Sequence, residues 1–167
     1  MDNAEQLKAD LLAQVEAGAQ ALQIFDTWAG AVPAVDFDRW VIDPTARIVS
    51  GVKSGAPDVP VIGFARGIGD RLEGYIRGTG VDAVGLDASI SAADAARKIQ
   101  PICPVQGNLD PAYLMAGGAE MECAAGDILD VLGGGPFVFN LAHGIHKDTP
   151  PAHVERLAEI VRAWSPS

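Results

Sequence analysis

Cysteines and long apolar runs are scarce in this sequence, and each scarcity excludes a class of protein. Only two cysteines occur in 167 residues. Neither Cys103 nor Cys123 belongs to a CxxC pair, so the sequence predicts no disulfide framework and no zinc cluster, and we expect both thiols to be buried as small apolar groups. No window approaches the roughly eighteen uncharged apolar residues of a membrane-spanning helix. Residues 1–6 are acidic where a signal or transit peptide is basic, so we expect a cytoplasmic protein.

Basic residues are few and dispersed. The 12 Lys and Arg residues stand singly along a chain whose formal net charge is −10. Such a chain offers no basic stripe to nucleic acid and no polybasic segment to an anionic membrane, so neither is expected as a partner. The same charge repels polyanionic small molecules at long range. An anionic ligand would therefore need a local group of arginines or helix N-termini.

Apolar residues, in contrast, are plentiful. They make up 49% of the sequence, which is enough for the core of one domain over residues 1–167. Short, continuously apolar segments recur, each followed by a polar or Gly-rich corner and a helical stretch, and this pattern is typical of parallel strands covered by helices on both faces. The predicted strands are Ala21–Phe25, Val59–Ala65, Asp82–Asp87, Cys103–Asp110 and Phe137–Ile145.

Helical patterns fill the intervals between these strands. Apolar residues at helical spacing predict helices over residues 5–18, over 37–53 with an interruption near Pro44, and over 69–77. Capping residues mark further helix starts, at Ser91 with Asp94 in the manner of a capping box, at Asp110 before Pro111, and at Thr149 before Pro150.

Alternating strands and helices predict a parallel sheet with ligands at the carboxyl ends of the strands. Two architectures compete on this basis. A doubly wound open sheet is comfortably built in a chain of this length, whereas a complete (β/α)8 barrel needs about 250 residues, so this chain would be several units short. Neither a GxGxxG nor a Walker A motif follows any predicted strand, so the usual sign of a nucleotide site is missing.

Each predicted strand ends in polar side chains that would meet on one face of such a sheet. They are Asp26 and Thr27, Arg66, Asp87, Gln106, Asn108 and Asp110, and Asn140 and His143. Structural roles compete with functional ones here: Asp110 as a helix cap, Asp87 as a cap or a pocket residue, and Arg66, His146 and His153 at the surface. His143 differs, because Gly144 beside it would leave room for the imidazole, and both roles stay open for it.

Sequence motifs follow one another in a characteristic order from about Leu7 to Ala163. They read LLAQVEAGAQALQIFDTWAG, PVIGFARG, GVDAVGLD, VQGNLDP and FNLAHGIHKDTPPAHV. In order and spacing they resemble the C-terminal half of the uroporphyrinogen decarboxylase family. The resemblance implies an α/β fold, a partial (β/α)8 TIM barrel with roughly the last five βα units, in a protein that usually forms a homodimer. It also implies a carboxy-lyase of heme and porphyrin biosynthesis that converts uroporphyrinogen III to coproporphyrinogen III without cofactor or metal.

The resemblance also assigns site residues. Phe25 and Thr27 correspond to the family's pocket phenylalanine and to its substrate-contacting serine, and the threonine keeps the hydroxyl. His143 corresponds to the active-site histidine near a substrate carboxylate, so the resemblance implies that it is both catalytic and substrate-binding. Related barrels transfer methyl groups through zinc that is held by a His-x-Cys pair and a further cysteine. Phe64, Arg66 and His143 stand at those positions here, so zinc chemistry is not expected.

Other parts of the family's site belong to its N-terminal half, which these motifs do not include. That half carries the arginines that bind substrate carboxylates and the aspartate that holds the pyrrole N–H groups. Decarboxylation through a protonated pyrrole depends on such electrostatic stabilisation. We therefore expect a truncated uroporphyrinogen decarboxylase that is inactive as an isolated fragment. The alternatives are a non-catalytic half-barrel remnant that acts as a binding or association module, and a complete small open-sheet enzyme.

Overall fold

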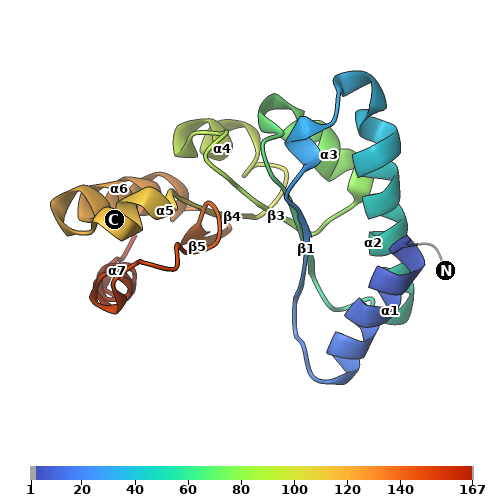
Figure 1. The fold of residues 1–167 in the computed structure, drawn as a ribbon, viewed down its shortest axis with the longest axis horizontal. Coiled ribbons are helices and arrows are strands. Elements are labelled where there is room, and N and C mark those ends of the chain that lie inside the picture. Colours follow the sequence, from blue (N-terminus) through green and yellow to red (C-terminus); the bar gives the residue numbers. More distant parts are fainter. Residues whose placement is uncertain (1–2, 167) are drawn as a thin grey trace. The chain divides into compact units, whose positions relative to one another are not determined.

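The computed structural model describes residues 3–166. Two compact units divide the chain, the first ending at Val84 and the second beginning at Gly85, and each is described by itself. Both units are built from parallel strands that alternate with helices along the chain (Figure 1). The single domain over residues 1–167 stays a prediction.

The first unit is built around strands β1 (Leu22–Asp26) and β2 (Val61–Ala65), which pair in parallel along their whole length. Strand β3 (Ala83–Gly85) pairs with β2, also in parallel. The helical elements are α1 (Asn3–Glu16), α2 (Asp43–Gly55) and α3 (Leu72–Thr79), with short turns of helix at Ala29–Ala31, Ala34–Asp36, Asp38–Ile42 and Gly69–Arg71.

Small residues let the helices of the first unit pack closely. A Cβ atom added at Gly63 in β2 would lie 2.7 Å from the hydroxyl of Tyr75, so the buried tyrosine of α3 packs directly on this strand. Likewise, a Cβ atom at Gly55 would lie 2.9 Å from a methyl group of Leu12, where α2 meets α1. The predicted interruption near Pro44 is confirmed: the π-helical turn Asp38–Ile42 changes to α-helix at Asp43, and Pro44 occupies the first turn of α2, where a missing N–H costs nothing.

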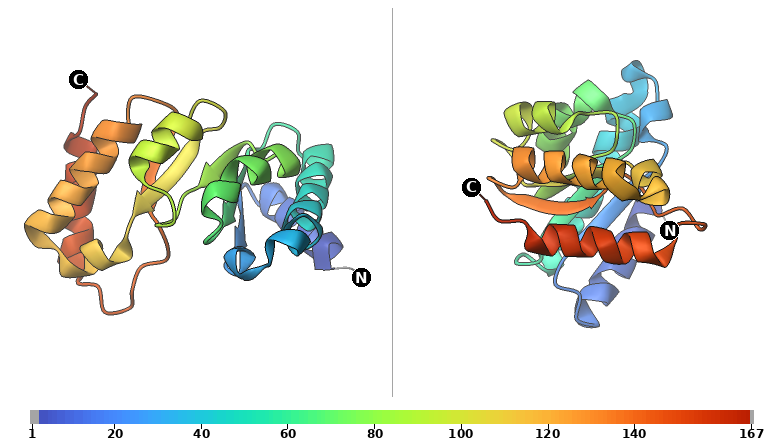
Figure 2. Two further views of the ribbon diagram at one scale, coloured as in Figure 1. Left: turned by 90° about the horizontal axis from the view of Figure 1, so that it is seen from above. Right: turned by 90° about the vertical axis from the view of Figure 1, so that its left-hand side faces the viewer.

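The second unit contains β4 (Val105–Leu109) and β5 (Phe137–Leu141), which pair in parallel along their whole length. Its helices are α4 (Ala92–Lys98), α5 (Pro111–Ala116), α6 (Gly118–Leu132) and α7 (Pro151–Ala163). Helices α6 and α7 lie side by side (Figure 2). Polar contacts join their exposed surfaces, since the Arg156 guanidinium donates to Glu122 at 2.8 Å and the Trp164 indole donates to Asp130 at 2.9 Å.

The strands lie in the order in which they occur along the chain, β1-β2-β3-β4-β5. A doubly wound sheet reverses direction at a switch point, whereas each strand of a (β/α)8 barrel is added beside its predecessor in one direction. The strand order therefore identifies a partial barrel and contradicts a complete doubly wound sheet.

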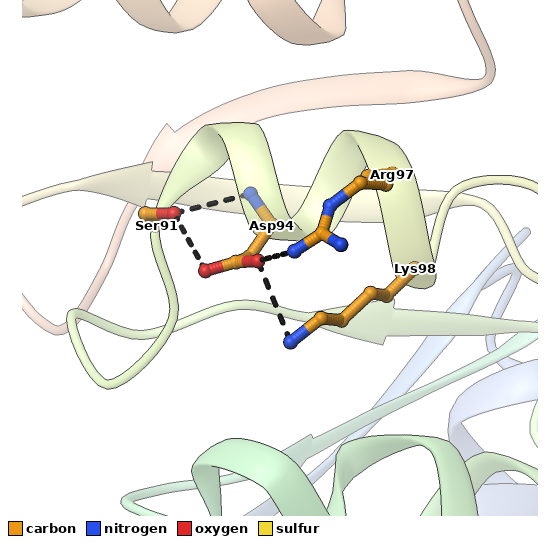
Figure 3. A network of polar contacts seen from close by, with 4 residues as sticks. All are labelled: Ser91, Asp94, Arg97 and Lys98. Carbon is orange, nitrogen blue, oxygen red and sulfur yellow. Dashed lines mark hydrogen bonds and ion pairs between the residues drawn. The ribbon is translucent and has the colours of Figure 1, made fainter.

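Two of the predicted helix caps are confirmed. The Ser91 hydroxyl accepts the N–H of Asp94 at 3.1 Å, and an Asp110 carboxylate oxygen accepts the N–H of Ala112 at 2.8 Å. Figure 3 shows the first of these caps, in which the Asp94 carboxylate also contacts Arg97 and Lys98. The hydrogen bond from Arg97 lowers the pKa of Asp94 below its usual value.

The cap predicted at Thr149 is wrong. Helix α7 begins at Pro151, Pro150 is the capping residue, and neither offers a side-chain hydrogen bond to the helix. Among the described residues the hydroxyl of Thr149 is buried without a partner. Either of the two consecutive prolines could occupy the first helical position, where proline is tolerated. The helix begins at the second proline, one residue later than predicted.

The structure corrects two further expectations in the second unit. Cys103 is buried as predicted, but Cys123 is exposed on α6. His153 is half-buried instead of at the surface, and its Nδ1 lies 3.0 Å from the carbonyl oxygen of Leu114 at the end of α5. Gly117, with φ 69°, separates α5 from α6, and a Cβ atom there would lie 2.5 Å from the His153 ring. The imidazole thus closes the corner between the helices.

Candidate functional site

Phe25 presents an aromatic ring near the carboxyl end of β1. Alternate side chains of a strand face opposite sides, so Phe25 lies on the other face from the buried Ile24 and is 68% exposed. Its ring packs at a tilt against Phe64 of β2, with the centroids 5.8 Å apart. The contact with Phe64 orients the Phe25 ring, and the exposed part of the ring can pack against a flat apolar ligand.

Thr27 follows directly after β1, in a corner that backbone hydrogen bonds hold in place. The Asp26 carboxylate accepts the N–H of Trp28 at 3.0 Å, which closes a tight turn over Thr27. Gly30 then donates its N–H to the carbonyl of Arg66 at 2.8 Å, so the loop after β1 rests on the loop after β2. Thr27 itself is exposed, and its hydroxyl has no hydrogen bond within residues 3–166. The hydroxyl is therefore free to meet a ligand.

Arg71 braces the same loop from the start of α3. Its guanidinium donates to the carbonyl of Val32 at 3.0 Å and to that of Gly30 at 3.4 Å, and it lies over the buried ring of Phe37 at 4.2 Å. Nothing in the sequence marked this residue, because its partners lie far along the chain and two of them are backbone carbonyls. Arg71 therefore fixes the backbone of the loop that carries Thr27, and its own side chain is occupied by these contacts.

His143 occupies the corresponding corner after β5, in the second unit. The buried Ala142 donates its N–H to the carbonyl of Leu109 at 2.7 Å, which extends the sheet by one residue and fixes the backbone beside His143. The imidazole is exposed and has no hydrogen-bond partner in the described part of the chain. The room expected from Gly144 is not needed, since a Cβ atom there would meet open space. The ring can therefore donate to an incoming carboxylate.

Asparagine and aspartate side chains at the other strand ends are engaged in the fold, whereas Arg66 is exposed as predicted. Asn108 donates to the carbonyl of Ile90 at 2.8 Å, and the side chain of Asn140 accepts the N–H of Leu141 at 2.8 Å. Asp110 caps α5, and Asp87 accepts the N–H of Ser89 at 2.9 Å in a turn. These contacts support the structural interpretation of the aspartates.

The three predicted site residues belong to different units. Phe25 and Thr27 flank Asp26 at the end of β1 in the first unit, and His143 follows β5 in the second. Each therefore lies at or just beyond the carboxyl end of a parallel strand, which is where (β/α) barrels place their sites. Their assignment as substrate-binding and catalytic residues stays a prediction.

Tyr75 is a further ionisable group near this end of the first unit that the sequence did not single out. Burial raises the pKa of Tyr75 to about 12. The negative charge of Asp26 adds to this increase, and a hydrogen bond with Thr45 reduces it. The phenol is therefore neutral at any physiological pH and holds α3 on β2. Its role is structural, and the packing of its hydroxyl at Gly63 explains why β2 carries a glycine there.

Within residues 3–166, no group of three or more His, Cys, Asp or Glu side chains is placed to hold a metal ion. None of the helices in that range is both long enough and apolar enough to cross a membrane.

Comparisons with known proteins agree with these features. The family model described as uroporphyrinogen decarboxylase matches residues 3–164. The chain is 56% identical over 153 residues to a uroporphyrinogen decarboxylase of Rhodospirillum rubrum, covering 92% of this chain and 44% of the relative. It is 50% identical over 155 residues to that of Novosphingobium aromaticivorans, covering 93% of this chain and 46% of the relative. The chain thus spans about half the length of these curated relatives.

A solved structure supports the fold. A methyltransferase from Methanosarcina mazei superimposes with a TM-score of 0.79 at 20% sequence identity, covering 94% of this chain and 46% of that one. At this identity the likeness concerns the fold alone. Together with the strand order, it confirms the predicted α/β fold with parallel strands of a partial barrel.

Proposed function

This chain belongs to the uroporphyrinogen decarboxylase family, and we propose that it supplies Phe25, Thr27 and His143 to the substrate pocket of such an enzyme. The reaction would be the conversion of uroporphyrinogen III to coproporphyrinogen III by cofactor-independent loss of the acetate carboxylates. The observation that carries the proposal is the identity of 56% to a named decarboxylase over 92% of the chain. Cytoplasmic location and assembly as a homodimer are part of the same proposal.

The exposed groups at the strand ends suit complementary parts of a tetrapyrrole. The available ring of Phe25 can pack on an apolar macrocycle. The Thr27 hydroxyl can donate to a carboxylate oxygen, and the His143 imidazole, when protonated, can form a charge-assisted hydrogen bond with another. Loss of carbon dioxide leaves electrons that a protonated pyrrole accepts, so the task of the protein is to orient carboxylates and stabilise charge.

We test the pocket first by binding, because binding does not require turnover. Coproporphyrin is titrated into the protein and its absorbance is followed. Removing a hydrogen bond to a charged group costs about 1.5–3 kcal/mol, so His143→Ala should weaken binding at least roughly tenfold. The control is His146→Ala, because His146 is also exposed and belongs to the same loop. Equal affinities of the two variants would contradict a role for His143, and absence of saturable binding would favour an association module.

Turnover is tested separately. We expect the 167 residues alone to convert no uroporphyrinogen, because the substrate-binding arginines and the aspartate that the resemblance places in the other half of the family's site are not among them. The net charge of −10 further weakens the attraction of a polycarboxylate. The protein is incubated anaerobically with uroporphyrinogen, and the oxidised products are separated by carboxyl number. Appearance of coproporphyrin at a rate above that of heat-treated protein would show that the chain is a sufficient enzyme.

A further inference from the structure

The backbone of Arg66 continues the pairing of β2 with β1 by one residue. Its N–H donates to the carbonyl of Asp26 at 2.9 Å, and its carbonyl accepts the N–H of Gly30 at 2.8 Å. Both groups therefore point towards β1 and the loop that follows it, as expected for an extended residue in a parallel ladder. In the register of the two strands Asp26 pairs with Ala65, so the next pair places Arg66 beside Thr27.

The side chains of Thr27 and Arg66 share one face of this strand pair. Successive side chains of a strand point to opposite faces, so Thr27 lies on the same side as Phe25, and Arg66 lies on the same side as Phe64. The rings of Phe25 and Phe64 pack on each other, which shows that the two sides are the same face. Two aromatic rings are thus followed, towards the carboxyl ends of the strands, by a hydroxyl and a guanidinium.

The guanidinium of Arg66 is available to a ligand. Its side chain is exposed and makes no hydrogen bond or ion pair with the described residues 3–166. Asp26 lies on the opposite face, where its charge acts on Tyr75 of α3. The guanidinium of Arg71 is occupied by carbonyls of the loop after β1. Arg66 therefore places an unpaired positive charge beside the hydroxyl of Thr27.

We propose that Arg66 and Thr27 together bind one carboxylate of the tetrapyrrole, while the ring of Phe25 packs on the macrocycle. The inference rests on the proposed function and adds to it a residue that the resemblance did not assign. A guanidinium presents parallel N–H groups that match the two oxygens of a carboxylate, and the hydroxyl donates a further hydrogen bond. Neighbouring strands lie about 4.8 Å apart, so both side chains can reach the same carboxylate.

The charge of the chain gives this local cation its importance. With a formal net charge of −10, the protein as a whole does not attract an anionic ligand. A carboxylate is held only where positive charge and donors are gathered at one place. The end of β2 supplies both in the first unit.

The test is titration of the protein with coproporphyrin, a porphyrin with carboxylate side chains. Arg66→Gln removes the charge and the paired donors, and it should weaken binding at least roughly tenfold. Arg66→Lys keeps the charge without the planar guanidinium and should weaken binding less. The matched control is Arg77→Gln, which changes the net charge equally at an exposed arginine of α3 that pairs with Glu73, and it should bind like the parent. Circular dichroism verifies that the variants fold.

A double variant tests whether the two groups hold the same carboxylate. The loss of affinity in Thr27→Val/Arg66→Gln should then be smaller than the product of the two single losses. A loss equal to that product would overturn the shared carboxylate. Equal affinities of Arg66→Gln and Arg77→Gln, while His143→Ala still weakens binding, would overturn the role of Arg66 and leave the proposed function standing. Absence of saturable binding by the parent would refute both.

Discussion

Gly30 offers a sharp test of how the corner beside Thr27 is built. A Cβ atom at this position would lie 2.6 Å from the carbonyl oxygen of Gly67 and 2.8 Å from that of Arg66. Both obstacles are backbone atoms, so no side chain can rotate away, and the loop after β1 must move off the loop after β2. This movement would break the hydrogen bond of 2.8 Å from the Gly30 N–H to the Arg66 carbonyl.

The expected cost follows from these two effects. Overpacking of a tight contact costs about 1–3 kcal/mol, and the lost hydrogen bond costs about 1 kcal/mol. The free energy of unfolding should therefore fall by about 2–4 kcal/mol in Gly30→Ala. Gly74→Ala is the matched control, because the same change on α3 meets no atom within 4 Å. There the better helix propensity of alanine should stabilise the protein by up to about 1 kcal/mol.

The assay is urea unfolding followed by tryptophan fluorescence. The protein has three tryptophans, and Trp28 and Trp40 belong to the first unit. A Trp164→Phe background therefore restricts the signal to the unit that contains both glycines. The unfolding midpoint should fall by about 1 M or more for Gly30→Ala and rise slightly for Gly74→Ala. Midpoints that shift in the same direction would refute the steric reasoning.

Two further predictions concern stability. Tyr75 contributes fully below the unfolded pKa of about 10, and that contribution is lost as the pH rises towards the folded pKa of about 12, a loss of up to about 3 kcal/mol. Urea unfolding at about pH 9 and about pH 11 should show about half of this loss, about 1.4 kcal/mol, in the parent and not in Tyr75→Phe; an identical decline in both would exclude Tyr75 as its source. Asp110→Ala should cost about 1 kcal/mol because the N–H of Ala112 loses its cap. Thr149→Val should cost nothing, because its buried hydroxyl has no partner among the described residues. Thermal unfolding of both variants tests this contrast, and equal losses would contradict it.

The strands and most helix starts were predictable because their signals are local. Continuous apolar runs located the strands within a few residues, and Ser91 and Asp110 cap helices through bonds that span two or three residues. Thr149 misled the prediction because two consecutive prolines satisfy the same local rule. Cys123 was predicted to be buried but is exposed, and His153 was predicted to be exposed but is half-buried. Burial depends on which helices and strands pack around a residue, and composition alone does not specify them.

Local patterns in the amino-acid sequence were enough to predict the alternation of strands and helices, and its motifs were enough to predict the family and the candidates Phe25, Thr27 and His143. The strand order and the bracing of the Thr27 corner by Arg71 became apparent only in the folded chain. The two kinds of interaction differ in the sequence distance that they span. Propensities, caps and apolar runs act over a few residues, whereas strand pairing and a guanidinium on distant carbonyls join segments that only folding brings together.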